Sequence, residues 1–198
     1  MQGSNPRSTP QYNVDPAGDL ILLVGQEENQ IPIRVSSKVL GLASQVFATM
    51  FGPRYLEGHV LSNQARFSIP SFSLPDEDPE AMTWFCRALH LQVDGNETGI
   101  TLGLRLKIAT LCDKYDASTA LSGWSQFWLR DLSDPMVRDP TVPSDHAAKV
   151  LYMSYAFRNH WAFWLVTRDI VYHSSLEDIR GLKDRSKDSI LPDRLLGK

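Results

Sequence analysis

Histidine, cysteine and carboxylate side chains carry most of the chemistry that proteins perform, and in this 198-residue chain they are scattered. No two histidines have the spacing of a metal-binding pair, and neither Cys86 nor Cys112 has a CxxC partner. The chain also contains no GxGxxG, P-loop or GxSxG motif. We therefore expect no metal, no cofactor and no enzymatic activity. The five histidines are His59, His90, His146, His160 and His173.

Two groups of charged residues could still take part in acid–base or cation chemistry. Asp113 and Asp116 flank Lys114 at helical spacing, which is typical of a solvated helix face. The stretch DEDPE, residues 76–80, places carboxylates at a predicted helix start, where they stabilise the helix dipole without a ligand. We interpret both groups as structural, and an enzyme remains an alternative hypothesis.

The composition indicates a globular protein that stays inside the cell. A hydrophobic fraction of 42% with 22% charged residues allows a real core in one domain, with an appended subdomain as a variant. The net charge of −3 gives no general attraction to nucleic acid. Because no segment resembles a membrane span or a secretory signal, we expect a cytoplasmic and/or nuclear location.

The first half of the chain predicts a hairpin followed by capped helices. Residues 1–17 are poor in apolar side chains and predict a flexible segment. The runs DLILLVG and IPIRV, joined by a polar loop, predict a β-hairpin. Ser36 or Ser37 and then Ser44 are suited to cap two successive helices.

The second half predicts one more strand and then helices. Residues 65–76 alternate in polarity and predict a strand, and Asp78 followed by proline predicts a helix start. Apolar spacing predicts further helices over 104–117, 119–132, 144–157 and 159–173. Residues 134–143 predict a proline-rich linker, and 176–198 a solvated tail.

Three aromatic residues in the last predicted helix cannot all face the same side. These are Trp161, Phe163 and Trp164. We interpret them as packing at a junction with the preceding domain, and an exposed recognition patch is the alternative.

Several of these residues together resemble the core signature of BTB/POZ domains. The resemblance covers residues 19 to about 132. The stretch VSSKVL, residues 35–40, is most like the corresponding stretch in BTB proteins of filamentous fungi. The last two helices, 144–175, resemble the extension that often follows such a domain. The matching residues are Asp19 to Val24, Ile33-Arg34-Val35, Val39-Leu40, Ala43-Ser44, Phe47 and Met50-Phe51.

The resemblance implies an α+β fold for residues 18–133, with a small, mostly antiparallel sheet capped by a helical cluster and a two-helix C-terminal extension. It implies a homo-oligomerising protein–protein interaction module, with a further role as a substrate adaptor for a cullin-type ubiquitin ligase. The residues it implies for self-association are Asp19, Ser36, Ser37 and Lys38. Those it implies for partner contact are Met50, Phe51, Tyr55 and Leu56.

Other functions remain open. Many members of the family have a histidine and a basic residue where this chain has Ser36 and Ser37, which favours a monomeric scaffold or a transcription-linked module as the alternative. The basic residues of the tail leave nucleic-acid binding as a further hypothesis.

Overall fold

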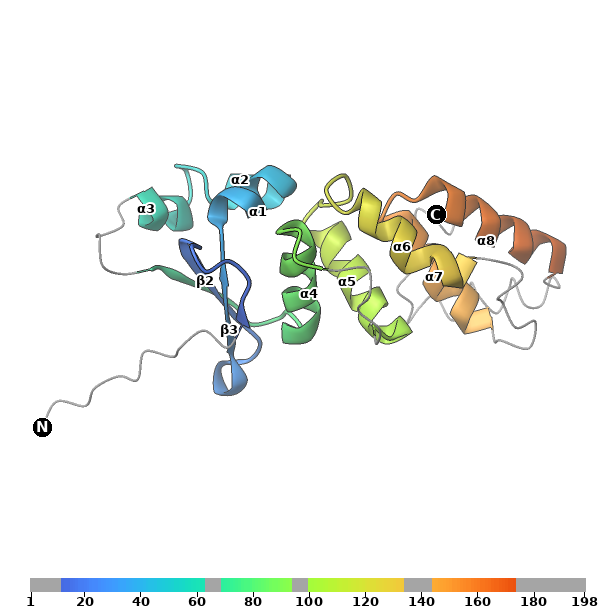
Figure 1. The fold of residues 1–198 in the computed structure, drawn as a ribbon, viewed down its shortest axis with the longest axis horizontal. Helices are drawn as coiled ribbons and strands as arrows, with labels where there is room; N and C mark the ends of the chain where they lie inside the picture. The colour runs from blue at the N-terminus through green and yellow to red at the C-terminus, as the bar shows by residue number, and fades with distance from the viewer. Residues whose placement is uncertain (1–11, 63–68, 94–99, 134–143, 174–198) are drawn as a thin grey trace, which may run out of the picture. The chain divides into compact units, whose positions relative to one another are not determined.

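The computed structural model describes residues 12–62, 69–93, 100–133 and 144–173. Figure 1 shows a small sheet with helices, so the fold is of the mixed α+β type. The chain divides into two compact units, residues 1–120 and 121–198. We describe each unit by itself.

Four strands form the sheet of the first unit, in the order β1-β3-β2-β4. The hairpin predicted from the sequence is confirmed: β2 (Leu20–Val24) pairs antiparallel with β3 (Ile31–Val35), and a 3-10 turn, η1 (Glu27–Asn29), lies between them. The edge strands β1 (Tyr12–Asn13) and β4 (Ser71–Leu74) pair parallel with β3 and β2 respectively. The sheet is therefore mixed, and the prediction of a mostly antiparallel sheet is wrong.

The first strand lies within the segment 1–17 that was predicted to be flexible. Residues 1–11 lie outside the described residues; from residue 12 on, β1 is in the sheet, Val14 is buried, and the Asp15 amide donates to the Arg34 carbonyl over 3.1 Å. Two residues that pair with a strand about 20 positions away leave no local pattern, which is why the sequence did not indicate this strand.

Five helices complete the described part of the first unit. After β3 come α1 (Ser37–Ala43), α2 (Gln45–Met50) and α3 (Leu56–Ser62), at the end of the sheet where β3 stops (Figure 1). The strand predicted over 65–76 is β4, shorter than expected: Ile69 precedes it, and Phe67 lies outside the described residues. Then follow α4 (Pro79–Leu89) and α5 (Leu102–Lys114).

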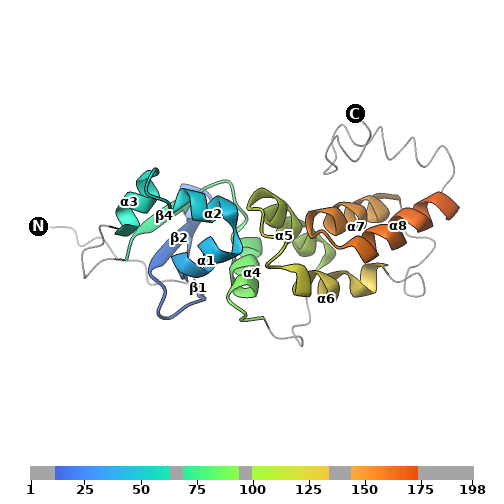
Figure 2. The same cartoon turned by 90° about the horizontal axis from the view of Figure 1, so that it is seen from above.

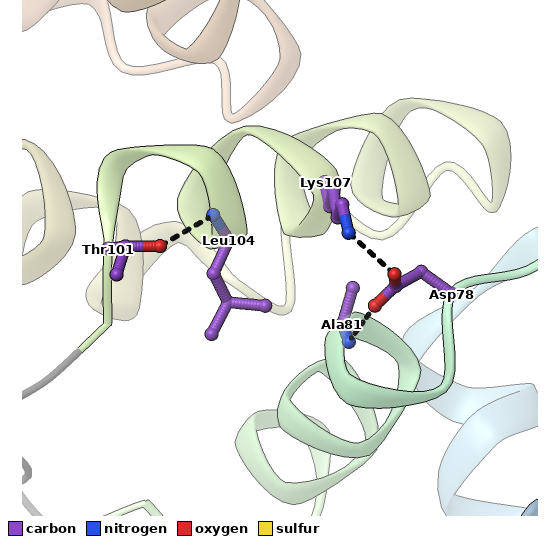
Figure 3. A network of polar contacts seen from close by, with 5 residues as sticks. All are labelled: Asp78, Ala81, Thr101, Leu104 and Lys107. Atoms are coloured by element: carbon purple, nitrogen blue, oxygen red, sulfur yellow. Dashed lines mark hydrogen bonds and ion pairs between the residues drawn. The ribbon is translucent and has the colours of Figure 1, made fainter.

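Side-chain caps explain where these helices begin. The predicted caps are confirmed, because the Ser36 and Ser44 hydroxyls accept from the amides three residues later, at 3.4 and 3.1 Å. Asp78 caps α4 in the same way, with Pro79 in the first helical position. Figure 3 shows the Asp78 cap and that of Thr101 on the Leu104 amide, which begins α5.

The core of the first unit lies between the sheet and the helices α1, α2, α4 and α5. The apolar spacing that predicted a helix over 104–117 corresponds to one buried face of α5, made by Leu104, Ile108 and Leu111. The largest fully buried side chains of this unit are Leu20, Leu22, Ile33, Leu40, Phe47, Met82, Phe85 and Ile108.

Three helices make up the described part of the second unit: α6 (Ser122–Ser133), α7 (Ser144–Ala156) and α8 (His160–His173) (Figure 2). They pack through buried side chains such as Trp128, whose ring centroid lies 5.6 Å from that of Phe157. The two C-terminal helices were predicted, and α6 lies with them in the compact unit 121–198. The expected boundary between a domain over 18–133 and an extension stays a prediction. The predicted linker, 134–143, and the tail, 176–198, lie outside the described residues. Among the helices that are described, none is both long and apolar enough to span a bilayer.

Candidate interaction surface

The residues expected to mediate self-association lie at the start of α1, and three of them serve the fold itself. Asp19 is half-buried, and its two carboxylate oxygens accept hydrogen bonds from the amide and the hydroxyl of Ser37, each over 2.7 Å. This pair ties the first residue of α1 to the start of β2. Lys38 is exposed on the surface of α1.

Ser36 fastens the same helix start to α4. Its amide donates to Nε2 of His90 over 3.1 Å, so Nε2 must carry a lone pair and the ring proton resides on Nδ1. Nδ1 then donates to the Cys86 carbonyl over 2.7 Å. Burial lowers the pKa of His90 below its ordinary value, against the opposite effects of the Cys86 carbonyl and the Asp15 carboxylate. His90 is therefore a neutral acceptor that connects the end of α4 to the start of α1. Ser36 and His90 lie 54 positions apart in the chain, so the sequence alone does not indicate this role.

A row of aromatic rings connects α2, β4, α4 and the end of α5, and it includes Phe51, one of the expected partner contacts. Phe47 is fully buried and lies face to face with Tyr115, with ring centroids 4.4 Å apart. Phe51 extends the row between Phe47, at 5.5 Å, and Phe72 of β4, at 6.1 Å. Phe85 closes the other end at 5.9 Å from Tyr115. Phe51 is half-buried and packs against the fully buried Phe47.

The Ser44 hydroxyl joins α2 to the end of α5. It is buried, accepts from the Phe47 amide and donates to the Tyr115 carbonyl over 2.5 Å. The Tyr115 hydroxyl in turn donates to Glu77 over 2.8 Å, and Lys114 pairs with the same carboxylate. Burial, followed by the hydrogen bond to Glu77, raises the pKa of Tyr115.

The acidic stretch before α4 is used for capping and for two ion pairs, that of Glu77 with Lys114 and that of Asp78 with Lys107. Burial raises the pKa of Asp78, but the hydrogen bonds from Lys107 and the Ala81 amide outweigh it, so the pKa lies below its ordinary value. Nζ of Lys107 lies 2.6 Å from the carboxylate (Figure 3). Asp78 therefore links α4 to α5, in line with the structural interpretation of this stretch.

Five exposed apolar side chains lie on or beside α1–α3, and we call this set the cap surface. Leu42 is 80% exposed and Leu56 76% exposed, both far more than a structural role requires. Of the expected partner contacts, Tyr55 and Leu56 belong to this surface, whereas Met50 is half-buried. The cap surface consists of Leu42, Val46, Tyr55, Leu56 and Val60.

A close backbone approach holds α3 in place. Gly58 is buried, and a β-carbon at this position would lie 2.0 Å from the carbonyl oxygen of Gly52 and 2.6 Å from that of Phe51. Only glycine allows the two backbones to come so near. The exposed residues of α3 therefore depend on Gly58 for their position.

A shallow groove of about 280 Å³ opens between β1 and α4. The Arg87 guanidinium lies 4.8 Å from the Trp84 ring centroid and donates to the Gln92 carbonyl over 3.1 Å. Sequence reasoning missed this groove because β1 was not predicted. It is lined by Tyr12, Asn13, Val14, Glu80, Thr83, Trp84, Arg87 and Gln92.

The described residues offer little for metal or thiol chemistry. They contain no group of three histidine, cysteine, aspartate or glutamate side chains able to hold a metal ion. Cys86 and Cys112 are free and buried, and burial raises the pKa of the Cys86 thiol to about 12.

Compared with models of known protein families and with curated proteins, the chain gave no match.

Proposed function

We propose that this chain is a protein–protein interaction module of the BTB/POZ kind that binds another polypeptide through its cap surface. The observation that carries the proposal is the exposure of Leu42 on α1 and Leu56 on α3, two short helices of the same unit. Single exposed leucines are common on proteins, but five exposed apolar side chains within one run of 19 residues, 42–60, favour a binding surface.

Burial of the cap surface would supply a useful part of a binding free energy. Removing two largely exposed leucine side chains from water contributes about 3 kcal/mol in total. The helices that carry them are fixed by the caps at Ser36 and Ser44 and by Gly58, so little conformational freedom is lost on binding.

The partner that we propose first is a second copy of the chain, in a two-fold arrangement where each cap surface covers the other. A role as substrate adaptor for a cullin-type ubiquitin ligase is the further step, and it rests on the resemblance to BTB/POZ domains.

One observation favours the alternative, a monomeric scaffold or transcription-linked interaction module. Both oxygens of the Asp19 carboxylate accept hydrogen bonds from Ser37 within the same chain. Pairing Asp19 with a basic group of a second copy would compete with these bonds. Self-association would then depend on apolar contacts alone.

Sedimentation of the full chain over a wide concentration series tests the proposal. We expect a monomer–dimer equilibrium that the double substitution Leu42→Ser/Leu56→Ser weakens by roughly ten-thousandfold, because each of the two copies loses about 3 kcal/mol of apolar burial. Leu91→Ser is the matched control, because Leu91 is equally exposed but lies after α4, outside the cap surface. A strict monomer for the wild type, or an equal loss in the control, would refute self-association through this surface.

A separate titration with a purified cullin N-terminal domain tests the adaptor role. Binding that is lost in the Leu42→Ser/Leu56→Ser chain and kept in Leu91→Ser would support it. Absence of binding by the wild-type chain would remove the adaptor role and leave the scaffold alternative.

A further inference from the structure

The helix α8 of the second unit presents a seam of residues at heptad spacing, of which Arg168 is half-buried and the others are exposed. Trp161, Trp164, Arg168 and Val171 follow one another at intervals of three, four and three residues, which places them in one row along the helix. Trp161 is 67% exposed, and Tyr172, next to the row, is 77% exposed. Ala162, Leu165 and Val166 of the same helix are buried, with Leu165 directly beside the seam.

The side chains of this seam are ordered by contacts with one another. The rings of Trp161 and Trp164 are stacked with centroids 5.2 Å apart. The Arg168 guanidinium lies 4.7 Å from the centroid of Trp164. Tryptophan, tyrosine and arginine are the residues most enriched at binding hot spots, and their order before binding reduces the entropy lost on association.

We propose that α8 pairs antiparallel with α8 of a second copy of this chain, through this seam. With the two-fold axis at position 166, Trp161 lies against the partner's Val171, and Trp164 lies against the partner's Arg168. In the first of these pairs a large ring lies against a small apolar side chain, and in the second a ring lies against a cation. Every seam residue therefore has a partner of complementary size or charge.

The charge of Arg168 decides the direction of the pairing. In a parallel pair, Arg168 would face Arg168 of the partner subunit in the middle of the seam, where two like charges repel. In the antiparallel pair each guanidinium lies on a tryptophan ring of the other copy and keeps its own Trp164 nearby.

The area of the seam sets the expected strength. The exposed parts of three large aromatic side chains and Val171 amount to about 500 Å² per copy. A symmetric pair would bury about 1,000 Å², which is at the lower limit for a specific interface. The contact is therefore a weak and reversible one.

This inference goes beyond the proposed function, because the seam and the cap surface lie in different units of the chain. The two contacts are tested separately by measuring dimerisation in the Leu42→Ser/Leu56→Ser chain, in which the contact through the cap surface is removed and only the seam can pair. Failure of one contact leaves the other testable.

The first experiment is sedimentation of the Leu42→Ser/Leu56→Ser chain at increasing concentration. Trp161→Ser should weaken dimerisation at least tenfold. The matched control is Phe127→Ser, which removes an exposed aromatic ring from α6 outside the seam and should leave the dimerisation constant unchanged. A chain that stays monomeric at the highest concentration, or that responds equally to both substitutions, overturns the proposal.

Disulfide cross-linking tests the direction independently. In the antiparallel pair two copies of position 171 lie about 15 Å apart along the helices, beyond the reach of a disulfide, and so do two copies of position 161. We expect no cross-linked dimer from Val171→Cys or Trp161→Cys alone, and a cross-linked dimer from the mixture. The native cysteines are buried and give no background. Cross-linking of Val171→Cys with itself, or none in the mixture, overturns the antiparallel pairing.

Discussion

The hydrogen bond from Ser36 to His90 makes the stability of the first unit dependent on pH in a way that two substitutions can separate. His90→Leu removes both ring hydrogen bonds and keeps an apolar side chain of similar size. His90→Gln keeps one acceptor and one donor but cannot become charged. The two variants therefore distinguish the hydrogen bonds from the titration of the ring.

The expected magnitudes follow from the contacts. His90→Leu leaves the Ser36 amide and the Cys86 carbonyl without their side-chain partner in a half-buried site, which costs about 2 kcal/mol. For a unit of this size such a loss lowers the melting temperature by about 8 °C. His90→Gln should lose less than about 1 kcal/mol, because its amide can form both bonds.

The direction of the pH effect follows from the lowered pKa. Because the pKa of His90 in the folded chain lies below its ordinary value of 6.5, the unfolded chain binds more protons between those two values. The stabilisation by neutral His90 is complete above pH 6.5, decreases as the pH falls towards the folded-state pKa, and is constant below it. Burial of the ring, which disfavours its charged form, is the physical reason for the loss, and a proton on Nε2 would also replace the acceptor of the Ser36 amide.

Urea unfolding followed by circular dichroism at pH values from about 5 to 8 measures the effect. The other four histidines are common to all three chains, so the difference between wild type and His90→Gln isolates His90. The backbone amide resonance of Ser36 should shift with the same midpoint. If the wild type and His90→Gln lost stability in parallel as the pH fell, the assigned tautomer and the role of His90 would be wrong.

Two further substitutions test the supports of the cap surface. Ser44→Ala should cost about 2 kcal/mol in urea unfolding, because the Phe47 amide and the Tyr115 carbonyl both lose a buried partner, and a cost under about 0.5 kcal/mol would contradict this. Gly58→Ala should cost about 2 kcal/mol and abolish dimerisation through the cap surface, since its methyl group meets the Gly52 backbone. Gly123→Ala, whose methyl group meets nothing within 4 Å, is the control and should be neutral or stabilising; dimerisation by Gly58→Ala at the wild-type strength would show that α3 takes no part.

The parts of the fold that the sequence predicted correctly depend on contacts between near neighbours. Ser36, Ser44 and Asp78 each bond to an amide three residues away, so their residue type and position indicate a helix start directly. The hairpin is likewise local, with two alternating runs joined by a short polar loop.

The parts that the sequence did not predict depend on distant contacts. The strand β1 has two residues and exists only because it pairs with β3. The assignment of α6 to the second unit results from packing between buried faces, which the helical pattern of residues 119–132 does not specify. The same holds for the candidate site: the sequence indicated Ser36 and Asp19, but their partners, His90 and Ser37, determine that these residues support the fold.

The placement of one proposed contact in each unit has a consequence for the size of the assembly. Two two-fold contacts in a single chain give a closed dimer when their axes coincide and a growing row of chains when they do not. In either case, removing one contact leaves only one two-fold surface. We therefore expect both Leu42→Ser/Leu56→Ser and Trp161→Ser to form nothing larger than a dimer, and the combination of all three substitutions to be monomeric. Light scattering after size-exclusion chromatography measures these masses, and a trimer or larger species from either partial variant would show that a third surface takes part or that one of the two contacts is not two-fold.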